Sequence, residues 1–175
     1  MSKSKKLRVK NALYLNANIL YGEVLNYIQK PEWKIKIKTQ GTLNKLKKEG
    51  YCLVTSVLTR MEIVQRLRRE QHKTSKEARS LYYTIIQDYT ITEIAGLHHI
   101  MNLSDAFLDD ISKRNIDFKD ALHLKIAEIL SIPVCTHDKK IRKGFSQHKD
   151  KEKYYSEVYK PEDLIKSKNL NRKGA

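Results

Sequence analysis

The sequence predicts an α/β fold with a central, mostly parallel β-sheet. Short apolar runs with strand character, such as 12–15, 51–54 and 134–136, alternate with longer segments whose apolar residues recur at helical spacing. Parallel strands are joined by crossover connections of a dozen or more residues, usually helices, so this alternation indicates βαβ units. Polar residues follow the strand candidates, at the edge where open α/β sheets place their functional sites.

The composition indicates one basic domain. The chain has 175 residues and a mass of 20.5 kDa, which suits one domain with a substantial core. Lys and Arg number 35 against 20 Asp and Glu, for a formal charge of +15, so a polyanion is the natural partner. A basic surface that is merely solvated remains the alternative. We place the domain at 11–165, between a basic arm at 1–10 and a basic, disordered tail at 166–175.

Cysteine usage and hydropathy predict a cytoplasmic protein that does not enter a membrane. Cys52 and Cys135 lie far apart, each in an apolar run, so neither a disulfide framework nor a zinc motif is indicated. No apolar run approaches the roughly 18 residues of a membrane span. Asparagines interrupt the apolar stretch after the basic N-terminus, which argues against a signal peptide.

The first half of the chain contains two strand-to-helix units. The strand at 12–15 ends in a polar turn at 16–18, and a helix with regularly spaced apolar residues follows. A second helix, Thr42 to Lys48, is ended by Gly50 before the second strand. We expect 30–38 to form a peripheral excursion, because its pattern fits neither a helix nor a core strand.

The helix after the second strand is charged on several faces. Thr55 and Ser56 are its expected caps. Its predicted apolar stripe comprises Val57, Leu58, Met61, Val64 and Leu67. Glu62 lies beside this stripe, where an i,i+4 ion pair with Arg66 is one explanation and a place in a functional site is the other. The second half of the chain continues the alternation, with a helix from Ser75, a strand at 89–94, a helix near 98–114 and an edge strand at 157–161.

Two carboxylates in the second half are hard to explain structurally. Asp120 lies at the open end of a mostly buried helix that starts after Asp117, and Asp138 follows the next buried strand. Like charges at such a position repel each other unless a cation lies between them, and hard divalent cations take oxygen ligands. The alternative is capping: Asp117 or Asp120 would cap one helix and Asp138 the next. Asn16 and Glu62 are expected to converge with them at one sheet edge.

Four motifs in order resemble those of the PIN-domain nucleases. They are a strand into NANIL, a strand into TSVLTRMEIV, the helix start FKDALHLKIA and a strand into CTHDKKI. The resemblance runs from about Leu13 to Pro161, and its last two motifs are the most specific. It implies a three-layer α/β/α sandwich and an acidic cluster that binds Mg²⁺ or Mn²⁺ and cleaves RNA. By this likeness Glu62, Asp120 and Asp138 match the second, third and fourth acids of the cluster.

At the first acid the chain departs from the family pattern. That pattern resembles L-D-x-N-I-L, and this chain has Asn16 in place of the aspartate. Asn is nearly isosteric with Asp, so we expect the fold to tolerate it, but a neutral amide oxygen is a weaker partner for a divalent cation. The resemblance therefore implies a catalytic and metal-binding set of Asn16, Glu62, Asp120 and Asp138 that is attenuated in this form.

Other side chains are expected to support the acids. Ser56 and Thr136 are predicted to orient the carboxylates through hydrogen bonds, and Asn18 is predicted to brace the first turn. His123 and His137 are more consistent with packing or hydrogen bonding than with metal ligation, since a hard cation prefers oxygen.

The resemblance thus implies a metal-dependent endoribonuclease acting on tRNA, rRNA or mRNA. The resemblance allows a VapC-like toxin restrained by a small antitoxin-like protein, or an RNA-processing enzyme, in either case with homodimerisation as an option. Cations on the Glu62 helix are expected to hold the RNA, namely Arg60, Arg66 and Arg69. One alternative is a catalytically inactive PIN-fold RNA-binding or scaffold protein, made credible by Asn16. Another is a receiver-like signalling domain, which is disfavoured because the +15 charge has no use in that role.

Overall fold

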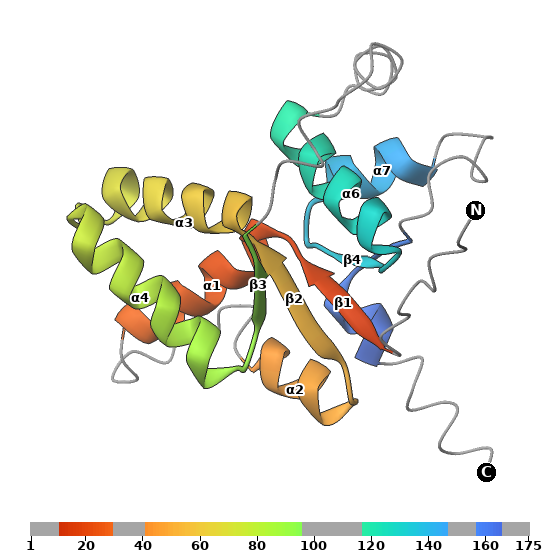
Figure 1. The fold of residues 1–175 in the computed structure, drawn as a ribbon, viewed down its shortest axis with the longest axis horizontal. Helices are drawn as coiled ribbons and strands as arrows, with labels where there is room; N and C mark the ends of the chain where they lie inside the picture. The colour runs from red at the N-terminus through yellow and green to blue at the C-terminus, as the bar shows by residue number, and fades with distance from the viewer. Residues whose placement is uncertain (1–10, 30–40, 96–116, 147–156, 166–175) are drawn as a thin grey trace, which may run out of the picture.

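The computed structural model of the chain describes residues 11–29, 41–95, 117–146 and 157–165, and its centre is a five-stranded sheet (Figure 1). The strands lie in the order β3-β2-β1-β4-β5, and every neighbouring pair is parallel. The predicted α/β class with a parallel sheet is therefore confirmed.

β1 occupies the centre of the sheet, between β2 and β4. The strands are β1 Ala12–Leu15, β2 Cys52–Ser56, β3 Thr92–Ile94, β4 Val134–Cys135 and β5 Val158–Tyr159. Because all of them are parallel, the residues that follow β1, β2 and β4 emerge at the same edge of the sheet. That edge carries Asn16, the start of the helix after β2, and Thr136.

Helices cover both faces of the sheet and give the three layers that the resemblance implied (Figure 1). They are α1 Ala17–Ile28, α2 Thr42–Lys48, α3 Val57–Glu70, α4 Ser75–Asp88, α6 Phe118–Leu130 and α7 Lys139–Ser146, with a helical segment at 161–165. Within the described residues, no helix has the length and apolar character needed to cross a membrane.

β1 is buried along its whole length because it is the central strand and both faces of the sheet are covered. Successive side chains of the strand point to opposite faces and so enter different cores. Leu13 and Leu15 belong to the larger apolar core, which includes buried residues of α1, α2, α3 and α4. Ala12 and Tyr14 belong to the core on the other face, where α6 contributes Ile126. The central strand therefore joins both layers of helices to one sheet.

Most element boundaries agree with the predictions. The predicted helix Thr42–Lys48 is α2, and Gly50 after it has φ +79°, a left-handed conformation that glycine adopts easily. β2 starts one residue later than predicted and extends to Ser56, and β3 is confined to Thr92–Ile94. Several predicted segments lie outside the described residues: the arm at 1–10, the excursion at 30–38, the helix at 98–114 and the tail at 166–175.

The buried face of α3 differs from the predicted stripe. Met61 was placed in that stripe but is 60% exposed, whereas Thr59 and Ile63 are fully buried. α3 packs against both α1 and α4, so contact with these two helices determines which of its faces is buried. That face includes Thr59, a polar residue that hydropathy alone does not predict to be buried. Of the predicted stripe only Leu67 is fully buried, while the partly buried members are Val57, Leu58 and Val64.

Alanine substitutions on α3 test this assignment. We expect Ile63→Ala to lower the free energy of unfolding by about 2–5 kcal/mol, because removal of a fully buried side chain leaves a cavity. Met61→Ala is the control on the same helix and should change stability by less than about 0.5 kcal/mol, since its side chain is exposed. Denaturant titration followed by circular dichroism compares them, and a larger loss at Met61 would contradict the observed face.

Candidate acidic site

Hydrogen bonds tie together the loops that follow β1 and β4. The Asn16 N–H donates to a carbonyl of β4 at 3.1 Å. Asn18 Nδ2 donates to Thr136 Oγ1 at 2.9 Å, and Asn18 Oδ1 accepts from the His137 N–H at 3.2 Å. Thr136 Oγ1 also accepts from the Asp138 N–H at 3.0 Å. Asn18 and Thr136 thereby hold the turn that carries Asp138 against the turn that carries Asn16.

Asn16 caps α1 from the end of β1. Its Oδ1 accepts from the Asn18 N–H at 3.1 Å, in the extended backbone conformation of an N-cap. The side chain is only 4% exposed, and its Nδ2 has no hydrogen-bond partner among the described residues. A buried donor without a partner costs about 1–3 kcal/mol. An aspartate would keep the cap and leave no donor unpaired, so the hydrogen-bonding surroundings favour a carboxylate at this position.

Asp120 lies in the first turn of α6, and the charges of the other acids affect its pKa. Burial is the main cause that raises its pKa from 3.8 to about 6. The charge of Asp138 is the next cause, and the charges of Asp117 and Glu62 act in the same direction, while His123 opposes them. The structure therefore brings Asp120 within electrostatic reach of Glu62 and Asp138, which are distant in sequence.

Two of the acids cap helices. Asp117 Oδ1 accepts from the Lys119 N–H at 2.9 Å, at the start of α6. Asp138 Oδ1 accepts from two N–H groups in the first turn of α7, at 2.6 and 3.3 Å. The capping alternative therefore holds for Asp117 and Asp138, whereas Asp120 forms no hydrogen bond with the described residues. Capping uses one oxygen of Asp138 and leaves Oδ2 for another partner.

A chain of hydrogen bonds leads from β2 to Glu62. Distances of 2.7 Å separate Ser56 Oγ from Tyr14 OH, Tyr14 OH from His123 Nδ1, and His123 Nε2 from Glu62 Oε1. Burial raises the pKa of Tyr14 to about 12, so the phenol keeps its proton. A carboxylate accepts hydrogen bonds, so His123 Nε2 donates to Glu62. With a neutral imidazole, His123 Nδ1 then accepts from Tyr14, and Tyr14 accepts from Ser56. The fully buried His123 therefore fixes the direction of Glu62.

This chain corrects two interpretations of the sequence and adds a residue that they missed. Ser56 occupies the N-cap position of α3, but its side chain makes no capping hydrogen bond and faces Tyr14 instead. Glu62 does not pair with Arg66, which binds Glu70 at 3.1 Å. Tyr14 was identified only as a strand residue. The available signal was its place in a buried strand, since a buried tyrosine usually needs a partner for its hydroxyl.

The arginines expected to hold RNA differ in their availability. Arg60 pairs with Glu93 at 3.2 Å. Arg66 pairs with Glu70, and its guanidinium lies 3.7 Å from the centroid of the Tyr21 ring. Arg69 is exposed and forms no ion pair with the described residues. Of the three, Arg69 is therefore the side chain that is available to an external partner.

The carboxylate oxygens of the acids suit a hard cation, but the acids do not form a complete metal-binding site. Within the described residues, no three or more His, Cys, Asp or Glu side chains lie close enough together to hold a metal ion. The oxygens of Glu62, Asp120 and Asp138 are nevertheless the ligand type that Mg²⁺ and Mn²⁺ prefer. The raised pKa of Asp120 reports unfavourable burial and repulsion, which a bound cation would offset.

The fold is a PIN-like α/β fold, with an all-parallel sheet in the order 3-2-1-4-5. The crystal structure of PAE2754 from Pyrobaculum aerophilum is similar to this chain with a TM-score of 0.50 and 17% sequence identity. The match covers 95% of this chain and 97% of that chain, and at this identity it shows the fold alone. No protein-family model and no curated protein matches the sequence.

Asp120 gives the metal-free protein a defined dependence on pH. Its pKa is raised in the folded state, so the folded protein binds this proton more tightly than the unfolded chain does. The stability that this proton contributes should be fully present below pH 3.8 and lost as the pH rises through about 6. Asp120→Asn removes this contribution, and the free energy of unfolding should depend less steeply on pH in that window.

Denaturant titrations in EDTA, at a series of pH values, measure the slope. The control is Asp163→Asn, which changes an exposed aspartate in the helical segment at 161–165. Its slope should follow that of the unsubstituted protein. An Asp120→Asn slope equal to the control would contradict the raised pKa.

Proposed function

We propose that the protein is a metal-dependent endoribonuclease that is attenuated by Asn16. The observation that carries this proposal is the raised pKa of Asp120, caused first by burial and then by the charge of Asp138, with a smaller effect of Glu62, at the carboxyl edge of a PIN-like sheet. Capping explains Asp117 and Asp138 but not Asp120. A partly buried carboxylate with other acids within electrostatic reach is unfavourable on its own, and a hard cation would offset that cost.

In this proposal three carboxylates supply the oxygen ligands. Glu62, Asp120 and the second oxygen of Asp138 would hold Mg²⁺ or Mn²⁺, which supplies an activated water and polarises the scissile phosphate. Other residues of the chain orient these ligands. His123 directs Glu62 through its 2.7 Å contact, and Thr136 holds the backbone at Asp138. Such supporting hydrogen bonds orient ligands and preserve their geometry.

Asn16 lowers the charge of this set by one. Its amide oxygen attracts a divalent cation less strongly than a carboxylate would, and that oxygen already accepts a hydrogen bond from Asn18. A carboxylate at this buried position would also cost several kcal/mol in desolvation without a cation, more than the about 1–3 kcal/mol that the unpaired Nδ2 donor costs. The neutral side chain therefore favours the metal-free protein while it weakens metal binding.

RNA is the proposed substrate because of charge. The chain carries a formal charge of +15, and phosphates dominate the binding of nucleic acids to basic proteins. A metal site of oxygen ligands is also suited to phosphodiester chemistry, in which the cation polarises a phosphoryl oxygen.

A catalytically inactive RNA-binding or scaffold protein is the second candidate. Two observations favour it: Asn16 is neutral, and within the described parts of the chain no group of acids is closed around a metal position. Both candidates bind RNA. They differ in how cleavage responds when position 16 becomes a carboxylate.

Asn16→Asp separates the two candidates. With Mg²⁺ or Mn²⁺, we expect the unsubstituted protein to cleave RNA weakly or not at all, and Asn16→Asp to cleave at least about tenfold faster, equivalent to about 1.4 kcal/mol in the barrier. Gel analysis of end-labelled RNA measures both rates. Equal rates at matched metal concentration would show that Asn16 does not attenuate the enzyme, and no cleavage by either protein would favour the scaffold.

Charge-neutral substitutions in the Asn16→Asp background test the other acids. Asp138→Asn keeps an oxygen that can cap α7, and Glu62→Gln still offers an oxygen to its histidine donor. Loss of cleavage in these variants or in Asp120→Asn would therefore report charge rather than misfolding. Asp163→Asn is the exposed control and should leave cleavage unchanged. Full activity in any one of the three would remove that residue from the site.

A further inference from the structure

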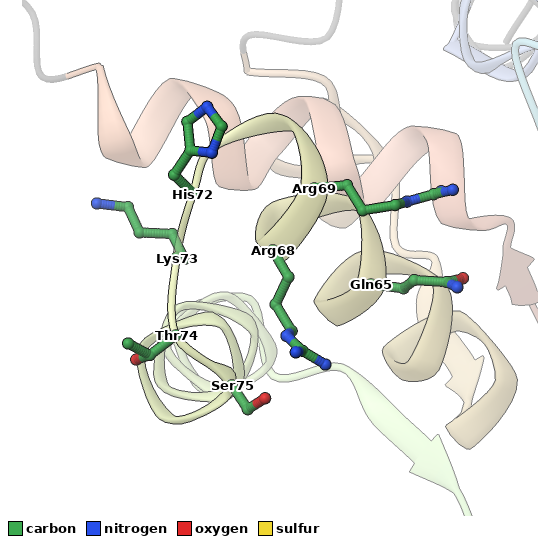
Figure 2. A pocket seen from close by; sticks show the side chains of 7 residues that line it. All are labelled: Gln65, Arg68, Arg69, His72, Lys73, Thr74 and Ser75. Atoms are coloured by element: carbon green, nitrogen blue, oxygen red, sulfur yellow. The ribbon is translucent and has the colours of Figure 1, made fainter.

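A basic hollow of about 730 Å³ lies at the turn between α3 and α4 (Figure 2). Its wall combines the last turns of α3 with the first residue of α4, and every lining side chain is polar or charged. The basic members are Arg68, Arg69, His72 and Lys73. Among the described residues that line the hollow none is acidic, so positive charge is concentrated there.

The acids nearest to this hollow in sequence are committed elsewhere. Glu70 accepts hydrogen bonds from the Tyr21 hydroxyl at 2.7 Å and from Arg66 Nε at 3.1 Å. Glu77 accepts from the N–H of Thr74 at 2.7 Å and closes the capping box of α4. Arg69 acts electrostatically on Glu70, and Lys73 acts on Glu77, but neither cation forms an ion pair with these carboxylates. The side-chain donors of the hollow therefore remain available to an external anion.

The cations on and just after α3 differ in whether they are paired. Arg60 pairs with Glu93, and Arg66 pairs with Glu70. The Arg and Lys side chains of the hollow, Arg68, Arg69 and Lys73, form no ion pair with any residue that the structure describes.

The start of α4 forms one side of the hollow. Ser75, the first residue of α4, lines it, and in Figure 2 the Arg68 side chain extends toward Ser75. The N-terminus of α4 is already capped by the Glu77 carboxylate, so the positive charge of the hollow comes from its side chains. These cations favour an anion with several oxygen acceptors.

The hollow and the acidic site lie along one face of α3. Glu62, Gln65 and Arg69 are spaced i, i+3 and i+7, which places them on the same side of a helix. Gln65 and Arg69 line the hollow, and Glu62 belongs to the acidic site. Seven residues of helix correspond to a rise of about 10 Å. A single strand of RNA is long enough to span that distance.

We infer that this hollow binds backbone phosphates of the RNA strand whose scissile bond lies at the acidic site. The inference rests on the proposed function in that it takes the polyanion to be RNA. Guanidinium groups form paired hydrogen bonds with phosphate oxygens, and the hollow presents two of them. It lacks the aromatic or aliphatic anchors that dominate protein interfaces, so an acidic protein is the less suitable occupant.

A pair of matched double substitutions tests the inference. Arg68→Gln with Arg69→Gln removes two charges from the hollow, and Lys45→Gln with Lys48→Gln removes two exposed charges from α2. The full chain with Asn16 is titrated with a fluorescent single-stranded RNA of about 12 nucleotides at several salt concentrations. If both arginines contact phosphate, the slope of log affinity against log salt should weaken by about 1.4, or about 0.7 per contact. The α2 variant should keep the original slope.

Two results would overturn the inference. One is an unchanged slope in the hollow variant, and the other is an equal change in both variants, which would report general surface attraction. A poly-glutamate peptide of equal charge serves as the competitor. RNA should be retained in preference to it, and a peptide that displaces RNA from the unsubstituted protein but not from the hollow variant would assign the hollow to an acidic protein.

A second experiment separates this inference from the proposed function. In the Asn16→Asp background, the two arginine substitutions should raise KM for a long RNA and leave kcat unchanged, because they act on binding away from the reacting atoms. If Asn16→Asp does not cleave RNA but the hollow variant still loses its salt slope, the nuclease proposal fails and the binding site stands. If Asn16→Asp cleaves RNA and the arginine substitutions leave KM unchanged, the nuclease proposal stands and the binding site fails.

Discussion

Repulsion between carboxylates at the carboxyl edge of the sheet is the constraint on which the candidate site depends. Each acid there except one has a compensating partner: the N–H groups of α7 for Asp138, and His123 for Glu62. Asp120 forms no hydrogen bond or ion pair with the described residues, and its pKa is raised although His123 acts against the rise. Asn16 caps α1 without adding a negative charge, so it does not increase the repulsion between the carboxylates at this edge. The edge is therefore compatible with a metal-free fold.

Paired and unpaired cations both occur along α3. Arg60 and Arg66 pair with Glu93 and Glu70, so they do not compete for the carboxylates of the candidate site. At the far end of the helix, Arg68 and Arg69 remain unpaired with the described residues and face a hollow. One helix thus connects a cluster of negative charge with a cluster of positive charge, the separation expected of a protein that holds a phosphate chain and brings a cation to it.

Local pattern was sufficient to predict most of the fold, because β1, α2 and α4 are set by apolar periodicity and by turn residues such as Gly50. It failed where distant neighbours decide the outcome. The face of α3 depends on contact with two other helices, and the Tyr14 to Glu62 hydrogen bonds join residues up to 109 positions apart. The positions of the acids after strands are enough to predict them as site residues. Local sequence does not reveal that Asp138 uses Oδ1 to cap α7 and leaves Oδ2 without a hydrogen bond to the described residues.

The central claim is that one missing negative charge at position 16 limits metal binding, and thermal unfolding with and without metal tests it most directly. In EDTA, Asn16→Asp should melt at a lower temperature than the unsubstituted protein, because burying a charge costs more than the about 1–3 kcal/mol regained by removing the unpaired Nδ2 donor. Saturating Mn²⁺ should stabilise Asn16→Asp more, with about 2.7 kcal/mol expected at 100 times the dissociation constant. Equal stabilisation of both proteins by Mn²⁺, or none in Asn16→Asp, would contradict the account.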